Sequence, residues 1–211
     1  MEPEFQKGNA AMHRTLRRGA ALVIRVVSIP PIMVTGLLLL LALCREDVFS
    51  SVTELLIAIG CLAIVPVLAY PISALVPALR EKKREGQRNL AFVLSLAGYL
   101  AGWLYGELHR SSQFLRIIFT TYLLSVLVLL LFNKVLHVRA SGHGCSVTGP
   151  LVFLAYFFGV WGLLAGALLF GAIFWASVAA KRHTPQEFLL GAAICLLSGG
   201  LAWLLCTQFM H

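Results

Sequence analysis

Long apolar runs separated by short polar segments dominate this chain. Five of them are long enough, or nearly so, to cross a hydrocarbon core about 30 Å thick at about 1.5 Å per helical residue. They are residues 22–44, 52–79, 90–108, 113–132 and 188–206. The first run is too long for the core of a signal peptide and lacks a small-residue cleavage site. We therefore expect it to be retained as a membrane span.

A sixth apolar stretch, residues 145–177, has two interpretations. It is either one long tilted helix or two short passes that turn near Gly159-Val160-Trp161-Gly162. The glycines permit the turn, and each arm of about sixteen residues would reach roughly 24 Å. Two passes would put His143 and His183 on the same side of the membrane, whereas one pass would separate them by the bilayer. We favour two passes and about seven segments.

The composition agrees with this pattern. With 59% hydrophobic and 12% charged residues, the chain is too apolar for a soluble domain. The sequence predicts an all-α fold, a polytopic transmembrane helical bundle of about six to seven segments. We expect residues 1–211 to form a single integral membrane domain with a basic N-terminal tail at residues 1–19.

The basic residues gather on one predicted face of the bundle. With two passes over 145–177, that face holds thirteen of the seventeen Lys and Arg residues. They are Lys7, Arg14, Arg17, Arg18, Arg80, Lys82, Lys83, Arg84, Arg88, Lys134, Arg139, Lys181 and Arg182. The other face is close to neutral. By the positive-inside rule the basic face is cytoplasmic.

Cysteines and carboxylates restrict the chemistry. The five cysteines show no C-x-x-C spacing and are expected to pack as small apolar residues. The one aspartate, Asp47, falls on the face away from His143 and His183. Since magnesium prefers several oxygen ligands, a two-metal site is not expected. We predict a site without a metal or cofactor.

Two short polar islands offer phosphoryl chemistry. One is Ser141-Gly142-His143, and the other runs from Lys181 to Glu187 and contains His183. A neutral imidazole can attack a phosphate ester and form a phosphohistidine, and a carboxylate at its other nitrogen orients it. Glu187, four residues after His183, suits that task if a helix begins at Pro185 with Thr184 as its N-cap.

The other side chains near these two segments would bind the phosphate and protonate the leaving group. His143 is a candidate general acid for the departing alcohol. Ser141 and Gly142 offer a hydroxyl and accessible backbone N–H groups at a helix start, where anions are favoured. Arg88, with Lys82 or Arg84, is a candidate to neutralise the remaining phosphate oxygens.

These residues resemble the three signatures of the phosphatidic acid phosphatase type 2 superfamily of membrane lipid phosphatases. Its patterns are K-x6-R-P, P-S-G-H and S-R-x5-H-x3-D. The second appears here as Ala140-Ser141-Gly142-His143, and the third as Ser177 with His183 and Glu187 at the family's spacing. Serine stands where the third pattern has arginine, and only Arg88 fits the first. The resemblance covers roughly residues 80–195.

The resemblance implies a metal-independent lipid phosphate phosphatase. His183 would be the nucleophile, Glu187 its orienting acid and His143 the proton donor, with Ser141, Gly142 and Arg88 as phosphate ligands. Lys181 or Arg182 would replace the missing arginine. Expected substrates are phosphatidate, phosphatidylglycerol phosphate or isoprenyl phosphates, and nucleic acid is not an expected partner. The alternative is a catalytically impaired relative that binds or transports phospholipids.

Overall fold

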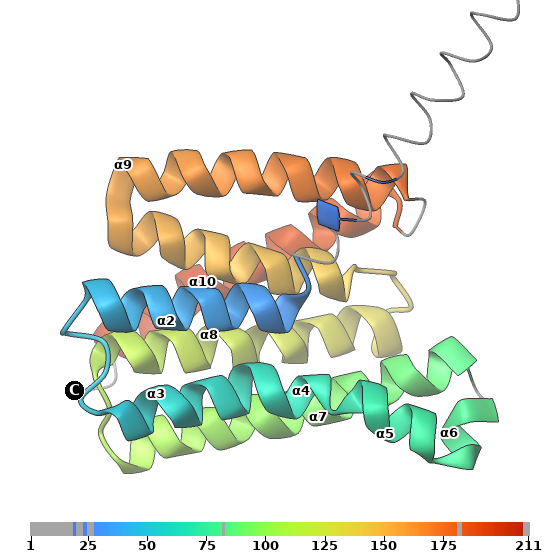
Figure 1. Cartoon of the computed structure of the whole chain (residues 1–211), viewed down its shortest axis with the longest axis horizontal. Helices are drawn as coiled ribbons and strands as arrows, with labels where there is room; N and C mark the ends of the chain where they lie inside the picture. Colours follow the sequence, from blue (N-terminus) through green and yellow to red (C-terminus); the bar gives the residue numbers. More distant parts are fainter. Residues whose placement is uncertain (1–18, 20–22, 25–27, 82, 181–182, 209–211) are drawn as a thin grey trace, which may run out of the picture.

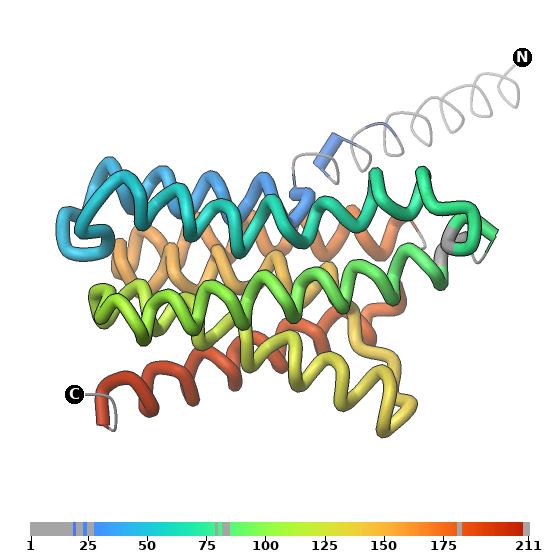
Figure 2. The backbone as a smooth tube through the Cα atoms, turned by 90° about the horizontal axis from the view of Figure 1, so that it is seen from below, coloured from blue at the N-terminus to red at the C-terminus, as the bar shows by residue number. Residues whose placement is uncertain are grey.

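The computed structural model describes residues 19, 23–24, 28–81, 83–180 and 183–208, which form a helical bundle without strands (Figures 1 and 2). Its elements are α2 (Pro30–Cys44), α3 (Val52–Ile59), the π-helical η1 (Gly60–Ile64), α4 (Val65–Val67), α5 (Ala69–Leu75), α6 (Pro77–Glu81), α7 (Lys83–Leu108), α8 (Gln113–Leu130), the π-helical η2 (Leu131–Val135), α9 (Gly142–Ala179) and α10 (Pro185–Gln208). The predicted all-α class is confirmed for this part of the chain.

Five helical segments are long and apolar enough to cross a membrane, as expected for an integral membrane protein. They are Val52–Leu75, Glu85–Leu108, Gln113–Val135, Gly142–Ala179 and Pro185–Gln208. Helix α2 is a shorter apolar helix within the first predicted run. The segments follow the apolar runs in the sequence closely. An apolar run in a membrane forms a helix because a helix satisfies its backbone hydrogen bonds internally.

Helix α9 folds back on itself at Gly159, which lies within the turn predicted from the sequence. Gly159 adopts φ 59° and ψ −138°, a conformation that residues with a side chain rarely adopt. The two arms, residues 142–158 and 160–179, then run side by side (Figure 1). A Cβ at Gly162 would collide with the carbonyl oxygen of Leu154, so a glycine allows the arms to meet. Both ends of α9 therefore lie at one end of the bundle.

Helix α8 forms the centre of the bundle. It packs against α7 and α10, while α10 also packs against α9, and α2 lies against α9 and η1. In the most apolar window of the α8 span, 56% of the residues are buried, against 22% to 39% for the other spans. Phe119 and Ile118 of α8 and Leu38 of α2 are fully buried within the main apolar core. The main core therefore joins α8 to α2 and to the helices around them.

Candidate functional site

The starts of α9 and α10 meet closely at one end of the bundle. The backbone N–H of Ser141 donates to the carbonyl oxygen of Glu187 at 2.9 Å. A Cβ at Gly144 would lie only 2.5 Å from the carbonyl oxygen of Phe188, and one at Gly191 would overlap the carbonyl oxygen of Ser141. Two glycines and a backbone hydrogen bond thus bring the Ser-Gly-His island to the histidine and glutamate of α10.

Glu187 is fixed in position by the first turn of α10. Its backbone N–H donates to Thr184 Oγ1 at 3.2 Å, and its Oε2 accepts from the Thr184 N–H at 3.1 Å. This reciprocal pair is a capping box, so the predicted helix start at Pro185 with a Thr184 cap is confirmed. The same Oε2 lies 3.7 Å from Nδ1 of His183. The carboxylate therefore faces the imidazole from a rigid helix end.

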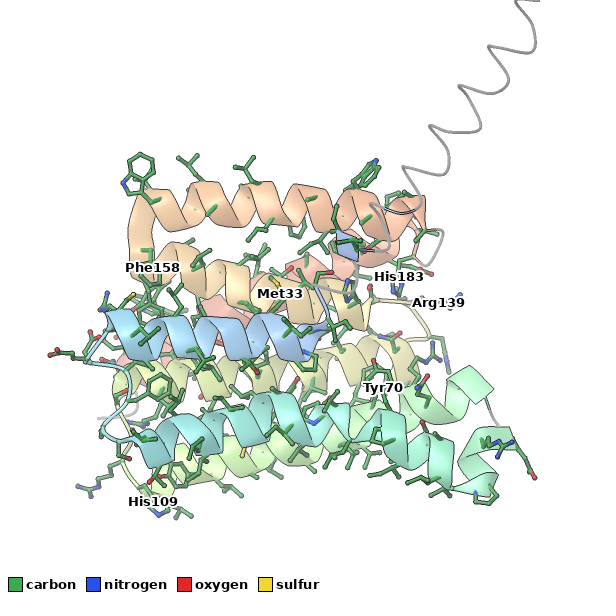
Figure 3. The ribbon with its side chains drawn as sticks, in the orientation of Figure 1. Met33, Tyr70, His109, Arg139, Phe158 and His183 are labelled. Atoms are coloured by element: carbon green, nitrogen blue, oxygen red, sulfur yellow. The ribbon has the colours of Figure 1, made fainter. Side chains whose placement is uncertain are left out.

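Arg139 is a site residue that the sequence analysis did not select. Its Nε lies 3.6 Å from Glu187 Oε1, and its side chain is 76% exposed. Figure 3 shows Arg139 and His183 at the same end of the bundle, with Phe158 and His109 at the other end. The available signal was its position two residues before Ser141, in the loop that the Ser141 to Glu187 hydrogen bond draws over α10.

One cavity of about 740 Å³ connects these groups. Its walls include Arg88 of α7, Arg139 from the loop before α9, His143 of α9, and His183 and Glu187 at the start of α10. Glu85 of α7 also lines it, so segments far apart in the sequence supply two imidazoles, two guanidinium groups and two carboxylates to the same space. Such a set can bind a dianion and move a proton.

His143 is held by an aromatic neighbour. Its ring lies 6.2 Å from the Phe188 ring, edge to face at 67°. Phe188 is fully buried and packs edge to face against both Phe170 and Phe174 of the second arm of α9. The aromatic cluster therefore restricts the position of the imidazole beside the cavity.

The predicted phosphate ligands have different surroundings. Arg88 and Gly142 line the cavity. The hydroxyl of Ser141 accepts from the Gly144 N–H at 3.0 Å and caps α9, and Ser141 is not part of the cavity wall. Lys82 and Arg182 lie outside the described residues, as does the side chain of Arg84. Ser177, at the position where the family pattern has arginine, is buried and lines the cavity.

Within the described residues, no three His, Cys, Asp or Glu side chains gather in a group that could hold a metal ion. No family model, curated protein or solved structure matches this chain. Fold and site define its class as an α-helical protein with five helical segments long and apolar enough to cross a membrane and a histidine-lined cavity at one end of the described bundle.

Proposed function

We propose that this protein is a metal-independent lipid phosphate phosphatase that works through a phosphohistidine. The observation that carries the proposal is the shared cavity of His143, His183, Glu187, Arg88 and Arg139 at the end of a membrane-spanning bundle. With the cavity at this end of the bundle, a lipid phosphate can reach the polar groups while its hydrocarbon chains stay among the helices.

In the first step His183 attacks the phosphorus atom. Its Nδ1 faces Glu187 at 3.7 Å, so Nε2 is the attacking nitrogen. A P–N bond forms and the P–O bond to the lipid alcohol breaks, while His143 gives its proton to the departing alkoxide. Arg88 and Arg139 neutralise the phosphoryl oxygens as charge develops on them.

In the second step water attacks the phosphohistidine. The neutral His143 accepts a proton from that water, the P–N bond breaks, and inorganic phosphate leaves with His183 restored. Glu187 keeps the His183 imidazole in one orientation through both steps and stabilises its positive charge. The cycle consumes one water and needs no redox partner.

Arg139 supplies the guanidinium that the resemblance leads one to expect at position 177. Ser177 and Arg139 line the same cavity, so a side chain from the loop before α9 borders the space that position 177 also borders. A guanidinium can grip two phosphate oxygens at once, which a hydroxyl cannot. This replacement favours an active enzyme over a decayed relative.

We also propose that the two arms of α9 each cross the membrane, which makes seven segments with the cavity end cytoplasmic. A single cysteine at the α9 turn, Trp161→Cys in a background without other cysteines, should react with a membrane-impermeant maleimide added outside intact cells. The same cysteine at Arg139 should react only after the cells are permeabilised. The reverse labelling pattern would mean that the cavity end faces outward. If both cysteines reacted from the same side, the proposal that each arm of α9 crosses the membrane would be wrong.

The deciding experiment is phosphate release by the detergent-purified protein in excess EDTA. Phosphatidate, phosphatidylglycerol phosphate and isoprenyl phosphates are offered to wild type, His183→Ala and His109→Ala. His109 is the matched control because it lies at the other end of the bundle, stacked on Tyr105. We expect release to survive chelation, to persist in His109→Ala and to fall at least about a thousandfold in His183→Ala.

A second function, binding or transport of phospholipids without hydrolysis, is favoured by Ser177 and by the first signature, of which only Arg88 is present. It predicts that neither wild type nor His183→Ala releases phosphate from any substrate, while lipid still protects the protein from thermal unfolding. That result would replace the catalytic proposal.

A further inference from the structure

The cavity does not end at the histidines. It continues into the bundle, where Tyr99 of α7 and Tyr122 and Ser125 of α8 form part of its wall. The two tyrosine rings contact edge to face, with their centroids 5.4 Å apart. The proposed phosphoryl transfer at the end of the bundle gives no role to these inner hydroxyl groups.

Tyr122 carries the strongest signal in this inner part. The residue is 4% exposed, and its hydroxyl has no hydrogen-bond partner among the described residues. A buried hydroxyl without a partner is destabilising, so such groups in native proteins usually await a water or a ligand. The hydroxyl of Tyr122 can donate one hydrogen bond to an acceptor oxygen.

The neighbouring helix leaves room for this hydroxyl. A Cβ at Gly149 of α9 would lie 3.0 Å from the Tyr122 hydroxyl oxygen. Gly149 follows His143 by six residues on the same helix, which places the hydroxyl about 9 Å further into the bundle than the imidazole. One ligand can therefore place its phosphate at His143 and an acceptor oxygen at the Tyr122 hydroxyl.

We propose that Tyr122 is a specificity-determining residue that donates a hydrogen bond to an ester carbonyl of the bound lipid. The inference rests on the proposed function, and it selects a glycerolipid phosphate among the substrate classes. Ester carbonyls follow the phosphate after one glycerol unit, on the way to the chains. An isoprenyl chain has no acceptor there and leaves the hydroxyl unsatisfied, which is how polar sites reject apolar analogues.

Apolar and aromatic residues on two sides of the bundle also line the cavity. Pro31 at the start of α2 and Pro66 and Tyr70 on the α4 to α5 side line the same space. Tyr70 is 52% exposed, so the wall of the cavity on this side includes a residue at the outer surface of the bundle. On this inference the acyl chains beyond the ester groups run between α2 and the α4 to α5 side toward the surrounding lipid.

The test uses two substrates that differ only in the carbonyl oxygens, dioleoyl phosphatidate and its dialkyl ether analogue. Hydrolysis and protection from thermal unfolding are measured for wild type, Tyr122→Phe and the control Tyr105→Phe. We expect wild type and Tyr105→Phe to prefer the diester about five- to tenfold in kcat/KM or in binding. Tyr122→Phe should bring the ratio to about one by weakening the diester alone.

A second variant protects the test against misfolding. Gly149→Ala keeps the tyrosine but presses a methyl group against its hydroxyl, so it should also lower the ester-to-ether ratio. An equal ratio in wild type and Tyr122→Phe overturns the inference, and leaves the proposed function standing if phosphate is released. If neither lipid is hydrolysed nor protects the protein, the proposed function fails and this inference fails with it.

Discussion

The two ends of the bundle carry similar charged residues in opposite arrangements. At the end remote from the cavity, Arg45 binds Asp47 at 2.6 Å and Arg116 binds Glu107 at 2.9 Å. At the cavity end, Arg139 and His183 lie 3.6 and 3.7 Å from the oxygens of a single carboxylate, Glu187. The remote pairs are short, whereas Arg139 and His183 lie farther from the carboxylate that both of them face, and they border the cavity.

Buried polar contacts complete the remote end. Glu54 is 5% exposed, and its two oxygens accept from the Ser111 hydroxyl at 2.6 Å and from the Ser50 N–H at 2.7 Å. Arg45 also donates to the carbonyl oxygen of Phe157, next to the turn of α9. These bonds tie three interhelical connections together, so charge at this end serves the fold.

The contrast shows that net charge alone does not locate a site. What separates the ends is how far the cations are neutralised by partners within the protein. A cation in short contact with a carboxylate has little attraction left for a ligand, while cations that lie farther from a carboxylate and border a cavity can attract an anion.

Arginine removal should affect the two ends differently, and this is the largest difference that we expect between matched substitutions at the two ends. Arg139→Ala should lower kcat/KM for phosphatidate about a hundredfold, since a guanidinium that contacts the transferring phosphoryl group is lost. Its thermal stability should change by less than about 0.5 kcal/mol, because the side chain is 76% exposed. Enzyme kinetics and thermal unfolding in the same detergent provide both readings.

Arg116→Ala is the counterpart at the remote end. The side chain is 16% exposed and its loss leaves Glu107, at 24%, without this partner. We expect a stability loss of about 1 to 2 kcal/mol with unchanged kcat/KM. If both variants lost activity equally, or if Arg139→Ala were the less stable, the distinction between the two ends would be wrong.

The helices and the α9 turn were predictable because each depends on local sequence. Apolar runs specify the spans, Gly159 permits a backbone conformation other residues avoid, and Thr184 with Glu187 forms a capping box within one turn. His183 and Glu187 share that turn, so their proximity was predictable too.

The placement of Arg139, Ser141 and Tyr122 was not predictable, because it depends on contacts between helices. Arg139 reaches Glu187 through a loop held by a tertiary hydrogen bond, and Ser141 is used as a cap. For Tyr122, the difficulty is that lipid-facing and protein-facing positions of a membrane helix are both apolar. Apolar periodicity therefore does not tell which face borders a cavity.

A smaller effect separates the two roles of Glu187. Glu187→Gln keeps the capping box, since glutamine also bonds back to the N-cap N–H, but removes the charge facing His183. We expect kcat to fall about tenfold to thirtyfold with little loss of stability. Glu187→Ala should match that loss of activity and also lose about 1 kcal/mol of stability with the cap. A glutamine variant as active as wild type would reduce Glu187 to a cap.

The smallest effect concerns pH at the remote end. The hydrogen bond from Arg45 lowers the pKa of Asp47 below its usual value. A carboxyl with a lowered folded-state pKa stabilises the fold above its unfolded pKa of about 3.9, and that contribution is lost as the pH falls through the folded value. The midpoint of thermal unfolding should therefore drop more for wild type than for Asp47→Asn between about pH 6 and pH 3. The difference should be small because the pair is exposed to solvent.

The same substitution should leave the pH dependence of kcat/KM unchanged, because Asp47 and the cavity lie at opposite ends of the bundle. If Asp47→Asn shifted that profile, the ends would be electrostatically coupled. If the two proteins lost stability in parallel on acidification, the Arg45 to Asp47 pair would contribute nothing measurable to the fold. Either result would show that the remote end is not an independent structural element. The expected pattern assigns pH-dependent stability to one end and pH-dependent catalysis to the other.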